Sequence, residues 1–469
     1  MGYRIEKDFL GEKHVPDDAY YGVQTLRGME NFHITGMPMS REPYFVKAFG
    51  YVKKAAAMAN RDLGVLDRTI ADAIIRACDR VIAGDMNDHF VTDFIQGGAG
   101  TSTNMNANEV IANLALESLG HKKGEYQYVN PNDHVNFGQS TNDVYPTAFH
   151  LGLILRLESY MEALRRLQAA FVAKAREFDR VLKMGRTHLQ DAVPMSLGAE
   201  FQGWGTTIGE EVNHLAEIAH LLHGINLGAT AIGTTVTAAP GYPALATKHL
   251  ADITGLKFTL AEDLIEATSD TGDYVLLSGV LKHTSVKLTK ICNDLRMLAS
   301  GPRCGFNEIN LPQMQPGSSI MPGKVNPVIP EVVNQTSFLV IGLDLTVTLA
   351  ASAGQLQLNV MEPVITFALF ASIAAMERAV TSLRVNCVEG ITANAEHTQE
   401  MVLNSLGIVT VLKPSLGYKQ CAEIAHEGHE TGKSLHDIVV KERKLLTQQK
   451  WDEVFSFENL INPKFEQST

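Results

Sequence analysis

Apolar residues that recur every seven positions through the middle of the chain limit its possible folds more than any other feature. The three runs are Leu157, Leu164, Phe171 and Phe178, then Phe201, Ile208, Leu215 and Leu222, then Leu281, Leu288 and Leu295. This spacing places the apolar residues along one side of a helix and is typical of long helices packed in a bundle. The sequence therefore predicts a mainly α-helical protein.

Prolines and glycines mark the expected ends of these helices. We expect Pro194 to open one helix, Gly301 and Pro302 to end another, Pro330 to precede a third, and Pro363 and Gly390 to bracket a fourth. Five long helices are predicted, at about 147–178, 194–223, 273–300, 331–351 and 363–389. Helices of this size reach roughly 30–45 Å at 1.5 Å per residue, which is longer than a compact monomeric domain usually needs. An oligomeric bundle explains this length.

The length of 469 residues is too great for one simple core. Shorter helices and loops are expected on either side of the long helices. We predict three domains: an N-terminal helical domain over 1–142, a central long-helix domain over 143–396, and a small C-terminal helical domain over 397–469.

Charge and cysteine usage exclude several classes of protein. The net charge of −12 gives no electrostatic reason to bind nucleic acid or an anionic membrane. The five cysteines form no CxxC pair, so neither a zinc ribbon nor a dithiol motif is expected. The charged N-terminus lacks the apolar segment of a secretory signal, and the cytoplasm is the expected location.

Two apolar stretches raise the question of a membrane span. The stretch from Phe338 to Gly354 is interrupted by Asp344, and the stretch from Val364 to Met376 is too short to cross a bilayer. We expect both to be buried helices.

Three polar segments lie beside the predicted helices. Residues 96–106 (QGGAGTSTNMN) combine flexible backbone with hydroxyls at a helix N-terminus, which suits an anion, although Thr101, Ser102 or Thr103 could simply cap that helix. Residues 136–143 (NFGQSTND) hold more hydroxyl and amide groups than one helix cap requires. Residues 185–191 (GRTHLQD) place an imidazole beside a hydroxyl, with no second histidine at metal-ligand spacing.

A fourth segment, residues 315–327 (QPGSSIMPGKVNP), carries the strongest signal. Its prolines forbid a regular helix and its glycines supply hinges, so we expect a mobile loop. The spacing of Gly317 and Gly323, and the valine after Lys324, do not match a phosphate-binding loop.

This loop resembles the signature GSSxMPxKxNP of the aspartase/fumarase superfamily, which it matches from Gly317 to Pro327 without a gap. The other three segments follow in the family's order, and the resemblance runs from about Arg4 to Pro463. The runs QGGAGTS, QSTND and NPVIPEVVNQ look like the ammonia-lyase branch, whereas fumarases usually carry SGTQTNMN and SSND. Thr103 and His188 are compatible with the fumarase pattern, and the run GTTVT from Gly233 departs from the GTGLN of relatives.

The resemblance implies the three-domain fold of that family, in which five helices from each of four chains form a twenty-helix core. It also implies a homotetramer whose active sites each take segments from three chains. Ser318 matches the family's general base, and His188 with Asn142 would face the substrate's amino group. The implied carboxylate-binding residues are Thr101, Ser140, Thr141 and Ser319 on one side, and Thr187, Lys324 and Asn326 on the other.

The implied activity is the elimination of ammonia from L-aspartate to give fumarate, with no organic cofactor and no metal ligand set; an activating divalent ion stays open. A class II fumarate hydratase, which converts malate to fumarate and water, is the alternative. A catalytically silent scaffold and a polymer-binding helical scaffold fit less well, because the loop residues are intact and no basic stripe or repeat is present.

Overall fold

The computed structural model describes residues 2–461 and divides the chain into two compact units. Unit 1 comprises Met1–Glu162, Asn213–Ser285 and Ser337–Glu377, and unit 2 comprises Ala163–Val212, Val286–Thr336 and Arg378–Thr469. Met1 and residues 462–469, which belong to the first and third predicted domains, lie outside the described residues. The three-domain division stays a prediction.

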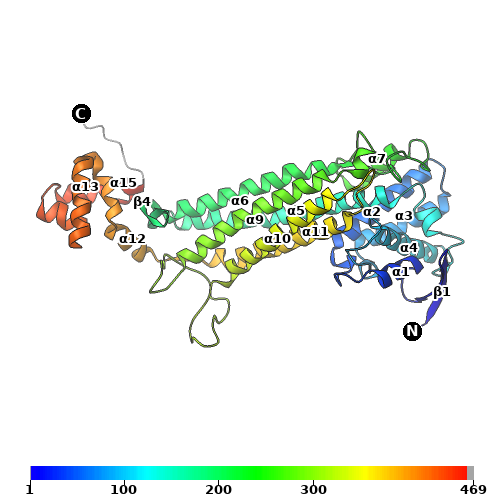
Figure 1. Ribbon diagram of the computed structural model, residues 1–469, viewed down its shortest axis with the longest axis horizontal. Helices are drawn as coiled ribbons and strands as arrows, with labels where there is room; N and C mark the ends of the chain where they lie inside the picture. Colours follow the sequence, from blue (N-terminus) through cyan, green and yellow to red (C-terminus); the bar gives the residue numbers. More distant parts are fainter. Residues whose placement is uncertain (1, 462–469) are drawn as a thin grey trace. The chain divides into compact units, whose positions relative to one another are not determined.

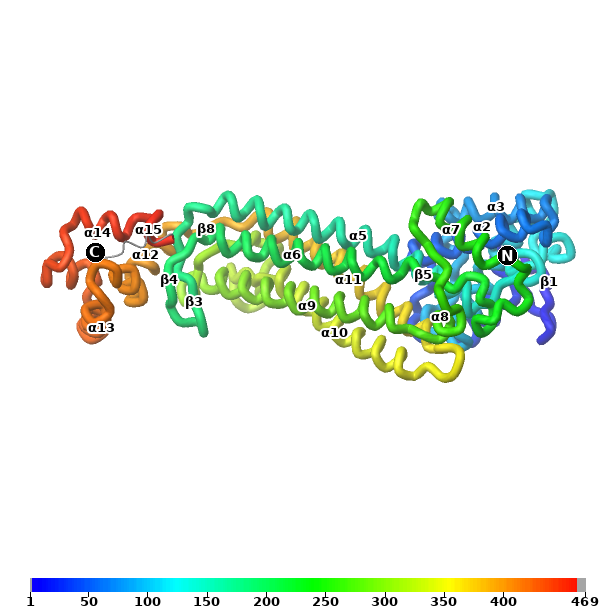
Figure 2. Tube along the Cα trace, turned by 90° about the horizontal axis from the view of Figure 1, so that it is seen from above, coloured from blue at the N-terminus to red at the C-terminus, as the bar shows by residue number. Residues whose placement is uncertain are grey.

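The five predicted long helices are present, and the chain is mainly helical. They are α5 (Thr141–Glu177), α6 (Leu197–Ala219), α9 (Gly272–Leu298), α10 (Val328–Ser352) and α11 (Glu362–Asn386), and they run side by side in both views (Figure 1, Figure 2). Every apolar residue of the seven-residue repeat is buried. The Phe178 and Phe201 rings, for example, meet edge to face with centroids 5.2 Å apart. The repeat therefore marks the packed side of these helices.

The prediction that Pro194 opens a helix is wrong. Pro194 lies in strand β4 (Gln190–Ser196), which pairs with β3 (Leu182–Thr187), and α6 begins only at Leu197. A proline is tolerated there because a two-stranded sheet has only edge strands. The start of α5 also differs from its prediction: it begins at Thr141 and holds Pro146 in its second turn.

Unit 1 contains the shorter N-terminal helices. They are α1 (Val23–Asn31), α2 (Pro43–Asp62), α3 (Arg68–Ala83), α4 (Thr101–Ser118), α7 (Tyr242–Thr254) and α8 (Glu266–Ser269), with the strand pairs β1 (Tyr3–Asp8) with β2 (Gly11–Pro16), and β5 (Gly224–Ile225) with β6 (Thr259–Leu260). Phe45 of α2 is fully buried against Tyr145 of α5 at 5.4 Å and Phe370 of α11 at 5.2 Å between ring centroids. These aromatic contacts hold α2 against the beginnings of α5 and α11.

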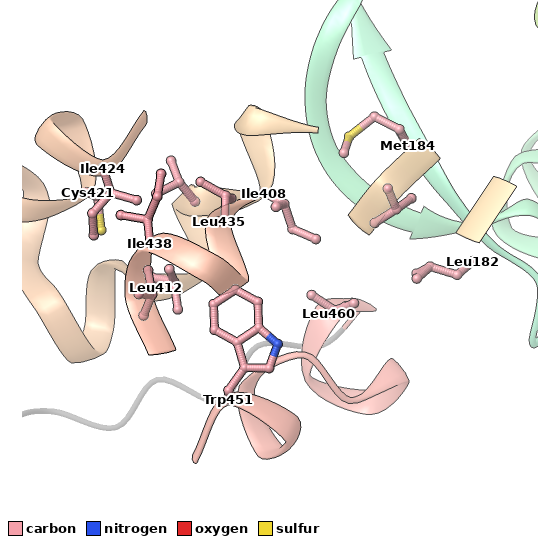
Figure 3. Packing of buried hydrophobic residues seen from close by; sticks show 13 residues of the cluster. Leu182, Met184, Ile408, Leu412, Cys421, Ile424, Leu435, Ile438, Trp451 and Leu460 are labelled. Carbon is pink, nitrogen blue, oxygen red and sulfur yellow. The ribbon is translucent and has the colours of Figure 1, made fainter. Parts of the chain in front are cut away.

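Unit 2 ends in a small helical core. Its elements are β7 (Ile309–Asn310), β8 (Thr392–Ala393), α12 (Ala395–Asn404), α13 (Lys413–Thr431), α14 (Gln448–Val454) and α15 (Phe457–Ile461). Figure 3 shows Trp451, Ile408 and Leu460 of this core together with Leu182 and Met184 of β3. The hairpin of β3 and β4 is therefore anchored in the C-terminal core, although its strands precede that core by about two hundred residues.

Two helices are long and apolar enough to cross a membrane by length and composition alone, Val328–Ser352 and Glu362–Gly390. The apolar window of the second is 61% buried, as expected for a core helix. The apolar window of α10 is only 28% buried, and the side chains of Phe338 and Leu349 are 59% and 62% exposed. The prediction that both stretches are buried thus fails for α10 within one chain.

Candidate active site

The first polar segment forms a sharp turn into α4. Gly98, Ala99 and Gly100 all have positive φ, at 86°, 55° and 94°. Gly100 is the N-cap residue of α4, and the Gln96 side chain accepts from the first-turn amide of Thr103 at 3.0 Å. The exposed Thr101 hydroxyl instead donates to the Gly98 carbonyl over 2.7 Å. The prediction that Thr101, Ser102 or Thr103 caps the helix is therefore wrong, and the amides of Thr101 and Thr103 donate to the Gly98 carbonyl and to the Gln96 side chain.

Replacing Gly100 with alanine is expected to destabilise the protein by about 3 kcal/mol, because the new Cβ adds steric overlap to an unfavourable φ. That atom would lie 2.2 Å from Cδ2 of the buried Tyr145 ring. Thermal unfolding monitored by circular dichroism measures the effect. Gly255→Ala is the matched control, because Gly255 has a φ of +71° and nothing lies within 4 Å of its added Cβ. An equal fall in Tm for both variants would contradict the steric argument.

The second polar segment begins α5. The Ser140 hydroxyl accepts from the Asn142 backbone amide at 3.2 Å, so capping explains part of this cluster, as the sequence suggests. The Thr141 hydroxyl accepts from the Asn104 amide group of α4 at 3.1 Å. The Asn142 side chain donates to the Ala231 carbonyl at 2.8 Å.

The beginnings of α4 and α5 therefore meet within unit 1. The Asn104 to Thr141 hydrogen bond and the contact of Gly100 with Tyr145 join the two helices at their first turns. Each helix N-terminus carries a partial positive charge. The two positive helix ends together favour negative charge beside Thr101 and Ser140.

A buried polar network lies beneath this site, and sequence reasoning missed it. The ammonium group of Lys53, which is fully buried, donates to Asn136 Oδ1 and Gln139 Oε1 at 2.9 Å each. Asn136 Oδ1 also accepts from the side chains of Asn104 and Asn108. Burial lowers the pKa of Lys53 to about 7. The network fixes the loop that leads into α5.

Asp143 completes the support of this segment. Its buried carboxylate accepts backbone N–H groups from Ser140 at 3.2 Å, Gly228 at 3.1 Å and Thr230 at 2.8 Å. Burial raises the pKa of Asp143 to about 7, and its hydrogen bonds oppose that rise. The acidic residue of the QSTND run thus holds the hydroxyl residues in place and does not itself face outward.

The third polar segment forms the turn of the β3–β4 hairpin in unit 2. Thr187 pairs with Gln190, so His188 and Leu189 form a two-residue loop with φ of 55° and 62°. Both residues are exposed. This turn normally favours asparagine and glycine, so a histidine in this conformation is strained and marks a candidate functional position.

Ion pairs hold the base of this hairpin. Glu308, which is 1% exposed, accepts from Arg186 at 2.6 Å and lies 3.1 Å from the ammonium group of Lys183. Lys183 also pairs with Glu200 at 2.5 Å. Glu308 therefore ties the strand that carries Thr187 to the segment that leads into the signature loop.

The fourth segment is an irregular loop between β7 and α10. Gly317 closes it: its amide donates to the Lys324 carbonyl at 2.7 Å, and its carbonyl accepts from the Asn326 side chain at 2.7 Å. A Cβ on Gly317 would lie 2.6 Å from that Lys324 oxygen, so only glycine allows this approach. At the tip, Ile320 is 83% exposed. The absence of a regular helix agrees with the prediction.

Ser318 follows Gly317 in the same loop. Its hydroxyl oxygen accepts from the backbone amides of Ile320 at 3.2 Å and Met321 at 2.9 Å. Two donors on one hydroxyl oxygen favour its deprotonated form. Ser319 and Lys324 are exposed, and Asn326 is half-buried with its side chain on Gly317.

The ten predicted site residues thus fall into two groups. Unit 1 carries Thr101, Ser140, Thr141 and Asn142, and unit 2 carries Thr187, His188, Ser318, Ser319, Lys324 and Asn326. In each unit they lie at helix starts, a turn or a loop. Thr141 is buried, and the other nine are half-buried or exposed.

Two family models match the chain. A model described as "Lyase" matches residues 11–342, and one described as "Fumarase C C-terminus" matches residues 408–462. Among curated relatives, the aspartate ammonia-lyase of Pseudomonas aeruginosa is 57% identical and covers 98% of this chain and 97% of its own. The aspartate ammonia-lyases of Helicobacter pylori and Escherichia coli are 54% and 55% identical, also over 98% of this chain and 98% and 97% of their own.

Solved structures agree with this result. A fumarate lyase:delta crystallin from Brucella melitensis, bound to cobalt, has a TM-score of 0.94 and 49% identity, and covers 98% of this chain and 99% of its own. A class II fumarase from Schistosoma mansoni has a TM-score of 0.91 at 34% identity, with the same coverage. The fold is that of the superfamily, and the chain belongs to the aspartate ammonia-lyase family of the aspartase/fumarase superfamily.

Proposed function

We propose that this chain is a carbon–nitrogen lyase that reversibly eliminates ammonia from L-aspartate to give fumarate. Its identity to aspartate ammonia-lyases, 54–57% over nearly the whole chain, exceeds its 34% identity to the class II fumarase. The structural observation that carries the proposal is the Ser318 hydroxyl, which accepts two backbone amides on the signature loop.

The chemical difficulty is the weak acidity of the C3 proton of aspartate. Its removal places a second negative charge on the β-carboxylate, and preorganised hydrogen-bond donors stabilise such a charge best. The positive ends of α4 and α5 lie beside the hydroxyl groups of Thr101 and Ser140, so we assign the β-carboxylate to this site. In the same assignment Thr101, Ser140, Thr141 and Ser319 surround that group.

The remaining assigned residues hold the other end of the substrate. Thr187, Lys324 and Asn326 bind the α-carboxylate, for which the ammonium group of Lys324 provides the compensating charge. Asn142 and His188 face the amino group. The polar tip of the hairpin and the signature loop would both contribute to this end of the site.

Ser318 acts as the general base in this mechanism. A serine oxygen is a poor base unless its alkoxide is stabilised, and the amides of Ile320 and Met321 provide that stabilisation. The alkoxide takes the C3 proton, the C3 electron pair forms the double bond, and the C–N bond breaks with its electrons on nitrogen. Neutral ammonia leaves from the ammonium group, so no strong general acid is required.

The proposed assembly is a homotetramer with active sites built from three chains. In one chain α10 exposes Phe338, Leu339, Leu345 and Leu349, each at least 55%, although the helix is strongly apolar. Water-exposed apolar surface of this kind favours burial against another helix. The five free cysteines support a reducing compartment, and the cytoplasm is the proposed location.

Light scattering coupled to gel filtration is expected to give a mass four times that of the 51.2 kDa chain. Leu345→Glu should shift the protein towards smaller species, because a charge would be buried in the proposed helix contact. The exposed surface residue Lys248, changed to Glu in parallel, should leave the mass unchanged. A monomeric wild-type protein would refute the assembly.

Fumarate absorbance in the ultraviolet tests the activity. Purified protein mixed with L-aspartate should produce fumarate, whereas L-malate should not. Fumarate from malate alone would make the protein a fumarate hydratase, and fumarate from neither would favour the silent scaffold.

A further inference from the structure

Two histidines meet across the long helices α6 and α9, and neither is assigned to the substrate. The imidazole rings of His214 in α6 and His283 in α9 lie edge to face, with their centroids 5.6 Å apart. Both residues are exposed, and the two helices run side by side in both views (Figure 1, Figure 2). Ring nitrogens from two neighbouring helices can therefore reach one bound ion.

Glu211 brings a carboxylate to this histidine pair. It precedes His214 by three residues in the same continuous helix, so helix geometry places it one turn away on the same side. Glu211 is fully buried, whereas the two histidines are exposed. One ligand atom from each of the three side chains lies within 4.8 Å of the other two. A carboxylate oxygen and two imidazole nitrogens thus gather at one point of the helices.

Proteins use this set of ligand atoms for transition metals. Metal sites in helix bundles are built from side chains on facing helices, and a glutamate followed three residues later by a histidine recurs in them. Zinc sites with three protein ligands keep a water in the fourth position, and two histidines with one glutamate form one such set. Imidazole suits Zn²⁺, whereas Mg²⁺ and Ca²⁺ take oxygen ligands. The residue types therefore favour zinc over magnesium.

The spacing of the ligand atoms fits a zinc ion after a small adjustment. Zinc lies about 2.0–2.2 Å from nitrogen and oxygen ligands, so the ligands of a tetrahedral site are roughly 3.4 Å apart. The three ligand atoms, which lie within 4.8 Å of one another, need to approach by roughly 1 Å. The exposed side chains of His214 and His283 can rotate by this amount, while Glu211 is held in the packed interior.

The buried carboxylate gives this cluster an ordinary structural explanation as well. A carboxylate that is removed from water needs hydrogen-bond donors or an opposite charge. Imidazole N–H groups can donate hydrogen bonds to Glu211. A divalent ion would supply positive charge in addition, and only the ion uses the lone pairs of both histidines at once. Metal binding therefore separates the two explanations.

We propose that each chain binds one zinc ion through Glu211, His214 and His283, with water as the fourth ligand. The ion joins α6 to α9 and stabilises the long helices, a structural role that is independent of the lyase reaction. Sequence reasoning missed this site, because His283 follows His214 by about seventy residues and only the fold brings the two rings together.

Isothermal titration calorimetry with ZnCl₂ tests this site in the full-length protein. After treatment with EDTA and dialysis, we expect one tightly bound Zn²⁺ per chain, with a Kd that a large excess of MgCl₂ leaves unchanged. His214→Gln and His283→Gln should each weaken binding by about tenfold or more, because each removes one of three protein ligands. Glutamine can still donate a hydrogen bond, so circular dichroism in EDTA should show folded variants.

His220→Gln is the matched control, because exposed His220 belongs to another close pair, with its ring centroid 5.8 Å from that of His223. Among residues 2–461, that pair has no third metal-binding side chain close enough to complete a site. His220→Gln should bind Zn²⁺ as the wild type does. Thermal unfolding gives a second readout: equimolar ZnCl₂ should raise the Tm of the wild type and of His220→Gln, but not that of His283→Gln.

Three results would overturn the proposal. They are the absence of tight zinc binding, displacement of the bound zinc by MgCl₂, and an equal loss of affinity in His220→Gln and His283→Gln. The last result would mean that zinc binds to scattered surface histidines and not to the cluster of Glu211, His214 and His283.

Discussion

Ser318→Ala is expected to lower kcat for fumarate formation by at least about a thousandfold, because it removes the proposed general base. Methyl replaces the hydroxyl oxygen that accepts the Ile320 and Met321 amides. Those amides lie on an exposed loop, where water can replace the lost acceptor, so the fold should be preserved. Steady-state assays with saturating L-aspartate measure the effect.

Two controls separate this role from a general loop defect. The mass and the Tm of Ser318→Ala should match those of the wild type. Ser319→Ala changes the neighbouring hydroxyl and should lower activity less, since we assign Ser319 to carboxylate binding only. Near-wild-type turnover in Ser318→Ala would remove this residue from the base role.

Lys324→Met should lower kcat/KM for L-aspartate by roughly a hundredfold or more, chiefly through a higher KM, because a charge-assisted contact to the α-carboxylate is lost. Lys324 is exposed, and its side chain makes no hydrogen bond or ion pair within residues 2–461. Methionine keeps a similar length without the charge. Initial rates over a range of aspartate concentrations separate KM from kcat.

Lys248→Met provides the comparison for this variant. Lys248 is also exposed, and its substitution removes the same charge at a position far along the sequence from the signature loop. Its kinetics should equal those of the wild type. An unchanged KM and rate in Lys324→Met would refute the carboxylate assignment.

The long helices could be predicted because their signal is repeated. Each seven-residue run places several apolar side chains on one side, so a single misleading residue does not change the result. The β3–β4 hairpin could not be predicted. Its turn residues, His188 and Leu189, have positive φ, a conformation for which a sequence usually carries glycine or asparagine. The prediction that Pro194 opens a helix is wrong for the same reason, because Pro194 lies in β4 of this hairpin and α6 begins at Leu197.

The exposed side of α10 shows a second limit of sequence reasoning. An apolar sequence predicts burial, but it does not say whether the covering surface belongs to the same chain. Phe338 and Leu345 are each 59% exposed in the single chain. Hydropathy gives the same signal for a core helix and for a helix that packs against another chain.

The site motifs could be located from sequence, but their supports could not. Ser140 and Thr141 stand out as a run of hydroxyls, whereas Lys53 lies almost ninety residues earlier in an ordinary helical pattern. Its burial depends on Asn136 and Gln139 meeting it in three dimensions. Asn136, Gln139 and Asp143 lie in the polar run of residues 136–143, but nothing in the sequence links that run to Lys53.

The most direct test of the central claim is the reverse reaction in D₂O. The protein is incubated with fumarate and ammonium chloride, and the products are followed by proton NMR. We predict L-aspartate with one deuterium at C3, formed by the wild type and not by Ser318→Ala. Malate as the product, with no aspartate, would contradict the account and identify the protein as a hydratase.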